Sequence, residues 1–162
     1  MTPLEASAAA IDRFSDALWI EDGLAAGTPR VIASTRGRGA WEEAMALTPV
    51  VPSGMIDLDL VRDGTRLDVA YATGDELVLL QRGVSWTERT LARGPTSGVR
   101  VAAHGGETLV AWRHTAGARA MLVRGSELLA DQELGEGVTD FAVAAGPDGH
   151  GVTGCIHGNG AI

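Results

Sequence analysis

Short apolar segments alternate with polar turns along almost the whole chain. The turns contain glycine and aspartate, and most of the segments between them are rich in leucine and β-branched residues. Strands bounded by such turns at regular spacing are typical of an all-β sandwich, barrel or propeller. The hydrophobic pattern therefore predicts an all-β fold, and an internal repeat can indicate which kind.

One apolar strand recurs four times with a bulky or sulfur-containing residue at a shared position. The four segments are residues 17–21, 67–73, 109–114 and 152–157. The shared position holds Trp19, Tyr71, Trp112 and Cys155, which are 52, 41 and 43 residues apart. This spacing indicates a repeated supersecondary unit of about 40–50 residues.

Each recurring strand follows a turn and another apolar strand, so the two form a predicted hairpin. The preceding strands are residues 11–14, 56–61, 99–103 and 141–145. Gly64 and Gly149 each follow an aspartate in these turns, and glycine there accepts the positive φ of a hairpin. Three repeats continue into a second predicted hairpin, at residues 30–35 with 41–47, 76–81 with 86–92, and 118–124 with 127–134.

A unit of four antiparallel strands is the blade of a β-propeller. We therefore predict one domain over residues 1–162, an all-β, β-propeller-like array of four-stranded blades. Its repeats span about 7–53, 54–97, 98–137 and 138–162. The fourth repeat holds two predicted strands instead of four, which leaves a face and an edge of the stack uncovered. We expect a longer ring, a partner protein or self-association to complete it.

Two structural alternatives stay open. A β-sandwich also has short strands, although it does not predict the repeat. Residues 3–19 are rich in alanine and have apolar positions at near-helical spacing, so an N-terminal helix competes with the first predicted hairpin.

Composition narrows the classes of function. The chain has 162 residues, 45% of them hydrophobic, and a formal net charge of −8. That charge argues against nucleic acid as a partner, because phosphate binding needs clustered cations. No apolar run of spanning length occurs, so we expect no membrane association and a cytoplasmic location. All thirteen basic residues are arginine, which indicates a bacterial genome of high GC content.

The segment from Ser34 to Trp41 resembles the Asp-box hairpin of sialidase-type β-propellers, which reads S-x-D-x-G-x-x-W. Ser34 and Trp41 have the spacing of that motif, Arg36 stands where the family has aspartate, and the glycine is displaced by one position. Gly83 and Trp86 match the motif in the next repeat. The resemblance covers most of the chain as a degenerate blade pattern and implies a propeller fold.

Sialidases of this kind resemble one another in a catalytic set: an arginine triad, a tyrosine–glutamate pair and an aspartate. That set does not carry over, because the single tyrosine, Tyr71, stands at the packing position shared with Trp19 and Trp112. We therefore expect no catalytic residue in this chain alone. If it is an enzyme, the resemblance implies a glycoside hydrolase.

Four polar residues form the first candidate site. Glu21, Thr73, His114 and His157 each follow the shared packing position by two residues. Because side chains alternate along a strand, each lies on the same side as its packing residue and nearer the strand end. They are predicted to form an arc on one face of the array, either as a binding site for a ligand or partner or as solvated rim residues.

A second candidate site lies on the innermost strands. Asp57 and Asp59 alternate on one face of such a strand, Asp140 opens another, and Arg100 lies between them in sequence. Paired carboxylates of this kind serve in glycosidases, whereas single aspartates at strand starts bind backbone groups of turns. His150, Cys155 and His157 are too few and lack a second ligand pair for a zinc site, so no metal is expected.

The sequence thus predicts a non-catalytic binding or scaffolding module that presents loops on a propeller face to a protein partner. The alternative is a sialidase-like or other propeller that binds or hydrolyses glycans. No cofactor is expected.

Overall fold

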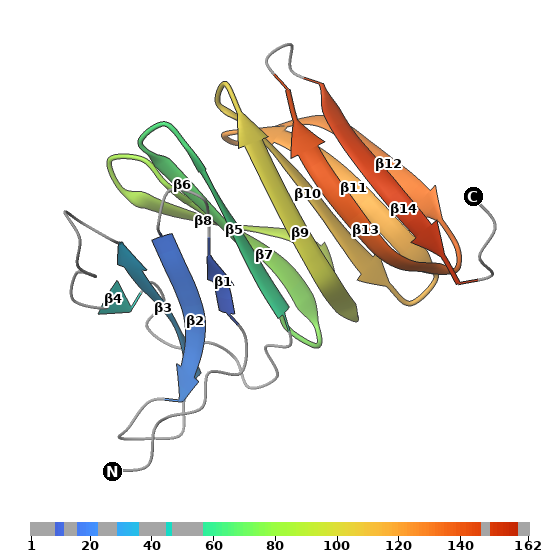
Figure 1. Cartoon of the computed structure of the whole chain (residues 1–162), viewed down its shortest axis with the longest axis horizontal. Helices are drawn as coiled ribbons and strands as arrows, with labels where there is room; N and C mark the ends of the chain where they lie inside the picture. The colour runs from blue at the N-terminus through green and yellow to red at the C-terminus, as the bar shows by residue number, and fades with distance from the viewer. Residues whose placement is uncertain are drawn as a thin grey trace.

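The structure of the chain is a computed structural model. It describes residues 9–11, 16–22, 29–35, 45–46, 57–146 and 150–158, and it describes side chains in the last two ranges. The described residues are β-strands joined by turns, with no helix among them, and Figure 1 shows their order. Among these residues no helix has the length and apolarity needed to cross a membrane.

The strands form three four-stranded sheets and one two-stranded sheet, all antiparallel and all in chain order. The first sheet contains β1 (Ala9–Ile11), β2 (Asp16–Asp22), β3 (Pro29–Thr35) and β4 (Met45–Ala46). The second sheet contains β5 (Asp57–Asp63), β6 (Arg66–Ala72), β7 (Glu76–Arg82) and β8 (Trp86–Arg93). The third sheet contains β9 (Thr96–His104), β10 (Glu107–His114), β11 (Gly117–Arg124) and β12 (Glu127–Gly135). The fourth sheet contains β13 (Val138–Ala145) and β14 (Gly151–His157).

The first strands of successive sheets are neighbours in space. β1 lies against β5, β5 against β9, and β9 against β13. Figure 1 shows the sheets stacked in chain order, with the first and fourth at opposite ends. The described strands therefore form an open array of repeated antiparallel sheets.

The predicted strands agree closely with the observed ones. Each predicted strand of residues 57–157 overlaps one of the strands β5 to β14, and the two predicted hairpins of each complete repeat are present. In the first repeat, β1 is Ala9–Ile11 where the pattern predicts residues 11–14, and β4 is Met45–Ala46 within the predicted 41–47. The alternative helix over residues 3–19 is wrong, because β1 and β2 lie in that segment.

The register agrees with the repeat alignment at Tyr71 and Cys155. Tyr71 pairs with Leu58 across β5 and β6, and Cys155 pairs with Phe141 across β13 and β14. Counting from the turns, Trp112 has the corresponding place in the third sheet, where Gly98 forms a β-bulge with φ of 60°. A glycine with positive φ is typical of one class of bulge.

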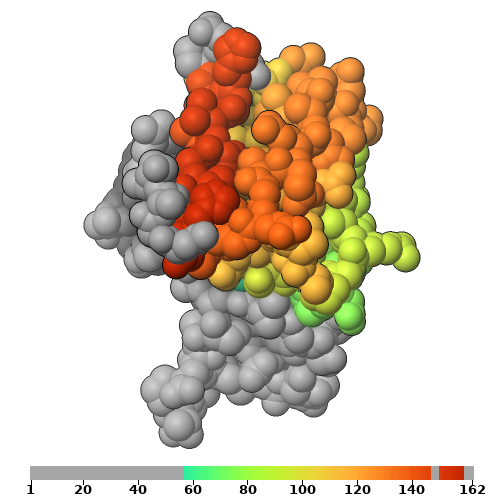
Figure 2. Space-filling model, turned by 90° about the vertical axis from the view of Figure 1, so that its right-hand side faces the viewer, coloured from blue at the N-terminus to red at the C-terminus, as the bar shows by residue number. Residues whose placement is uncertain are grey.

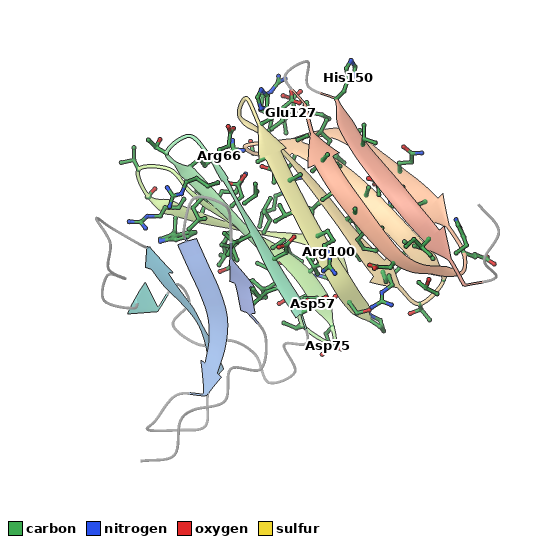
Figure 3. All side chains as sticks on the ribbon, in the orientation of Figure 1. Asp57, Arg66, Asp75, Arg100, Glu127 and His150 are labelled. Carbon is green, nitrogen blue, oxygen red and sulfur yellow. The ribbon has the colours of Figure 1, made fainter. Side chains whose placement is uncertain are left out.

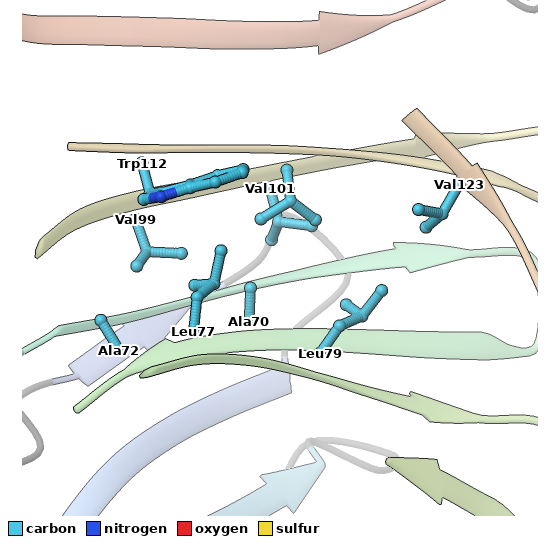
Figure 4. Close-up of a cluster of buried hydrophobic side chains, with 9 residues drawn as sticks. Ala70, Ala72, Leu77, Leu79, Val99, Val101, Trp112 and Val123 are labelled. Atoms are coloured by element: carbon cyan, nitrogen blue, oxygen red, sulfur yellow. The ribbon is translucent and has the colours of Figure 1, made fainter. Parts of the chain in front are cut away.

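The main core lies between the second and third sheets. The strands β6 and β7 are buried on both faces, as expected for a sheet covered by neighbours on each side. Figure 4 shows the apolar side chains that meet there. They are Ala70, Ala72, Leu77, Leu79, Val99, Val101, Val110, Trp112 and Val123.

A smaller core lies between the third and fourth sheets. Its buried members are Leu109, Ala111, Ala118, Ala120, Val138 and Phe141. Several of these side chains are alanines, so less apolar surface is buried here than around Trp112. Most of β14 remains exposed or half-buried.

Candidate functional site

The predicted arc lies at one end of the stack, which we call the hairpin end. This end carries the β6–β7 and β10–β11 turns and the β8–β9 and β12–β13 connections. Thr73 follows β6 there, His114 ends β10 and His157 ends β14. Glu21 is in β2, and its side chain lies outside the described residues.

Thr73 stabilises the turn in which it lies. Its side chain is buried, and its hydroxyl accepts hydrogen bonds from the amides of Asp75 at 3.2 Å and Glu76 at 3.0 Å. Its carbonyl accepts a hydrogen bond from the Thr96 hydroxyl of the next sheet at 3.1 Å. A threonine that binds backbone groups two and three residues away is a turn-forming residue. Thr73 therefore stabilises the β6–β7 turn at the hairpin end from a buried position.

His114 has the same repeat position and a related role. Its Nδ1 lies 3.3 Å from the Ala116 amide, and its Nε2 lies 2.7 Å from Glu133 Oε1. When Nδ1 accepts the amide proton, Nε2 carries the ring proton and donates it to the carboxylate. The side chain is 26% exposed, so His114 presents a polar edge at the surface.

His157 is also held by backbone. Its Nδ1 lies 3.1 Å from the Glu136 carbonyl, and Gly158 donates to the Gly137 carbonyl at 3.0 Å. These contacts fix the end of β14 on the β12–β13 connection. In the neutral ring, Nδ1 of His157 donates to the Glu136 carbonyl and Nε2 remains an acceptor.

A cavity of about 180 Å³ opens at the hairpin end between the second and third sheets. Trp112, which is almost fully buried, forms part of its wall. The lining residues are Ala92, Arg93, Gly94, Pro95, Thr96, Trp112, His114, Thr115 and Arg119. A neighbouring hollow of about 480 Å³ lies on the other side of the β10–β11 turn and is lined by that turn and by Glu136, Gly137 and Val138.

Two carboxylates of β12 partner two of the basic side chains that line the 180 Å³ cavity. Arg119 donates two hydrogen bonds of 2.6 Å to the carboxylate of Asp131, which raises the pKa of the guanidinium. Glu133, two residues after Asp131 on β12, bonds through Oε1 to His114 Nε2 at 2.7 Å. Arg93 is exposed and has no hydrogen-bond or ion-pair partner among the described residues. Among the described residues that line the cavity, Arg93 is thus the cation without a hydrogen-bond or ion-pair partner, and Trp112 forms part of the wall.

The aspartates of the second candidate site join two sheets. Asp57 Oδ2 and Asp59 Oδ2 accept hydrogen bonds of 2.9 Å from the amides of Val99 and Val101 on β9. Their Oδ1 atoms accept 2.9 Å bonds from the amides that follow them on β5. Burial raises the pKa of Asp59, against the lowering by the Val101 amide and by Arg100. Asp57 and Asp59 therefore act as ties between β5 and β9.

Arg100 and Asp140 are placed differently. Arg100 donates to the carbonyl of Val99 at 2.7 Å, close to the two aspartates, and Figure 3 shows Arg100 near Asp57. Asp140 stands on β13 at the repeat position of Asp57 and accepts a 2.9 Å bond from the Phe141 amide. Its other oxygen has no partner among the described residues. The structure groups Asp57, Asp59 and Arg100 and leaves Asp140 on a separate, exposed strand.

Two groups of residues were missed by sequence analysis. Arg93 and Arg119 line the cavity, although only the polar ends of the repeated strand were singled out. A polar cluster between the second and third sheets was also missed. In it Asp68 accepts from the Thr108 hydroxyl at 2.6 Å and from Arg66 Nε at 3.1 Å. A charged residue inside an apolar strand was the available signal for Asp68.

His150 and His157 lie near opposite ends of β14 and do not share a site. His150 precedes the strand and His157 ends it, and Figure 3 shows His150 at the end of the stack opposite Asp75 and the hairpin end. Cys155 lies between them and packs against the smaller core. No cluster of three metal-binding side chains occurs among the described residues. Comparisons of the chain with protein-family models, curated proteins and solved structures gave no match.

Proposed function

We propose that this chain is a non-catalytic binding module of the propeller type, which presents its hairpin end to a protein partner. The repeated four-stranded sheets and the Asp-box-like hairpins support the propeller part of the proposal. Rigid sheets that carry turns at one end are a common frame for binding loops.

The observation that carries the proposal is the cavity lined by Arg93, which has no hydrogen-bond or ion-pair partner among the described residues. The carboxylates of Asp131 and Glu133 already partner Arg119 and His114, whereas the Arg93 side chain is exposed. An arginine at the mouth of a small cavity binds a carboxylate well, because its planar fork matches the two oxygens. We infer that the partner contributes an acidic side chain.

One observation favours binding over hydrolysis. The four carboxylate oxygens of Asp57 and Asp59 all accept backbone hydrogen bonds. A carboxylate acting as nucleophile or acid needs a free oxygen toward the substrate. Glycan binding or hydrolysis stays the alternative function, and self-association stays an alternative to a different protein partner.

A peptide titration tests the proposal. A fluorescent peptide rich in glutamate is added to the full chain, and its anisotropy is followed at low salt. We expect Arg93→Ala to weaken binding roughly tenfold or more, the effect of losing one charge-assisted hydrogen bond. Arg82→Ala is the matched control, because Arg82 is also exposed and stacks on Trp86 at the opposite end of the sheet.

Equal binding by both variants would contradict the proposed site. A panel of glycans takes the place of the peptide in a second titration. Glycan binding that depends on Arg93, or glycan cleavage by the unmodified chain, would favour the alternative function. The mass of the chain in solution, measured by light scattering, shows whether the partner is a second copy.

A further inference from the structure

A second interaction surface lies far from Arg93, along the outer edge of β14. In the second and third sheets, the second strand pairs on both edges: β6 with β5 and β7, and β10 with β9 and β11. In the fourth sheet, β14 pairs with β13 and has no other strand partner among the described residues. Alternate N–H and C=O groups of β14 therefore point away from β13, and the described part of the chain has no strand that binds them.

A groove runs beside this edge. It has a volume of about 170 Å³ and is bounded by β14 on one side and by the third sheet below. Gly151 and Thr153 line it from β14. Leu109, Ala120, Leu122, Ala130, Gln132 and Leu134 line it from the third sheet. Figure 2 shows β14, in red, beside the orange surface of the third sheet.

The equivalent surface of the second sheet is covered. Leu77 and Leu79 of β7 are fully buried by the third sheet, and Leu79 corresponds in the repeat to Ala120. The groove residues Ala130 and Gln132 are exposed by contrast, and Leu122 and Leu134 are half-buried. An apolar floor beside an unpaired strand edge has the two features of a strand-addition site: backbone groups give affinity, and alternate side chains give specificity.

We propose that an extended segment of a partner polypeptide binds as an added strand, antiparallel to β14, with small apolar side chains pointing to this floor. The strand that fills the same place in the third sheet, β11, is antiparallel to β10 and packs Met121 and Val123 on the sheet below. Since the chain carries a net charge of −8, a segment with basic residues is favoured.

A second copy of the chain does not fit the same edge. A twofold axis that pairs two antiparallel β14 strands keeps the same face of each sheet on the same side. The third sheet of the partner copy would then occupy the place of β11 and β12, which line the groove beside β14. The groove can therefore accept a single added strand, but not a strand that carries a second sheet packed on the same face.

The probe is a fluorescent peptide with the sequence of residues 117–124, which carries two arginines and no acidic residue. We expect saturable binding of one peptide per full chain and slower hydrogen exchange at alternate amides of β14. Ala130→Arg places a bulky charge of the same sign as the peptide on the groove floor and is expected to weaken binding at least tenfold. Ala144→Arg is the matched control, because Ala144 is also an exposed strand alanine but does not line the groove. A scrambled peptide controls for charge.

Three results would overturn the proposal. One is binding that Ala130→Arg leaves unchanged. Another is slow exchange of all β14 amides in the free monomer, which would mean that the chain covers its own edge. The third is a dimer in which β14 is protected, which would assign the edge to a second copy. Because Arg93→Ala leaves this groove intact, failure here is distinguishable from failure at the hairpin end.

Discussion

The two described interfaces between neighbouring sheets use the same repeat positions with opposite chemistry. Between the second and third sheets, Asp57, Asp59 and Asp63 of β5 accept 2.9 Å hydrogen bonds from amides of the third sheet. Between the third and fourth sheets, Arg113 donates a hydrogen bond of 3.1 Å to the Thr139 carbonyl. One interface is tied by carboxylates and the other depends on apolar contact.

One pair of equivalent positions illustrates the difference between the two interfaces. Asp68 and Thr108 meet across the first interface, and their repeat equivalents across the second are Leu109 and Gly151. A Cβ added to Gly151 would lie 2.7 Å from Leu109 Cδ2, so the leucine needs a glycine opposite it. The first interface thus has a buried polar pair where the second has leucine against glycine.

At the repeat position of Asp57, the third sheet has Gly98 in place of a carboxylate. Its φ of +60° favours glycine, and an added Cβ would require the Arg113 guanidinium to move. The guanidinium of Arg113 crosses there to reach Thr139. The repeat therefore fixes the backbone of each sheet, while individual side chains decide how firmly neighbouring sheets are joined.

The largest expected effect is the loss of unfolding free energy on truncating a core side chain, and it should differ between the two cores. Trp112→Ala should lower the free energy of unfolding by about 3–5 kcal/mol, because the indole is 1% exposed in the larger cluster. Phe141→Ala should cost less, roughly 3 kcal/mol or below, since the fourth sheet is open and can relax. Denaturant unfolding measures both, with Val84→Ala, on a fully exposed side chain, as the control. A larger loss at Phe141 would reverse the comparison.

A second test uses the equivalent aspartates. Asp57→Ala should lower the free energy of unfolding by about 1–3 kcal/mol, because the buried Val99 amide loses its acceptor. Asp140→Ala should change it by less than about 0.5 kcal/mol, because Asp140 is exposed. Asp57→Asn keeps an acceptor oxygen and should recover part of the loss. Equal effects at the two positions would mean that β5 and β9 are not joined in this way.

A smaller effect depends on pH. Burial raises the pKa of Asp68 above 3.8, against the lowering by the Thr108 hydroxyl and by Arg66. The folded state therefore binds this proton more tightly than the unfolded state, and Asp68 adds stability as the pH falls through its raised pKa toward 3.8. The free energy of unfolding, compared with that of Asp68→Asn, should rise over this interval by about 1.4 kcal/mol per unit of pKa difference. A fall would show that the carboxylate is better stabilised in its charged form.

The smallest effect at neutral pH concerns Tyr71, the repeat equivalent of Trp112 and Cys155. Burial, followed by Glu88 and Glu76, raises the pKa of Tyr71 to about 12. Because the chain has one tyrosine, its tyrosinate absorbance reports this site directly. We expect ionisation near pH 12 in the folded chain and stability lost between pH 10.0 and about 12. Ionisation near 10.0 in the folded chain would place Tyr71 at an open surface.

The sequence by itself determined the strands, their order and their pairing within each sheet. These follow from the side-chain alternation and the turns, which are local features, and pairing partners in a hairpin are close in sequence. The shared position of Tyr71, Trp112 and Cys155 was also readable, because a repeat places equivalent residues at equivalent sites. The hairpin-end positions of Thr73, His114 and His157 followed from the same alternation.

Only the tertiary structure decided what those positions do. The bond from Val99 to Asp57 joins residues 42 apart, and the cavity of Arg93 and Arg119 exists because two sheets lie face to face. Such contacts depend on the separation and twist of neighbouring sheets and on side-chain length, which strand patterns do not encode. For the same reason Thr73 was predicted as a surface group but is buried in its turn, and the groove beside β14 became visible once the third sheet was seen beneath it.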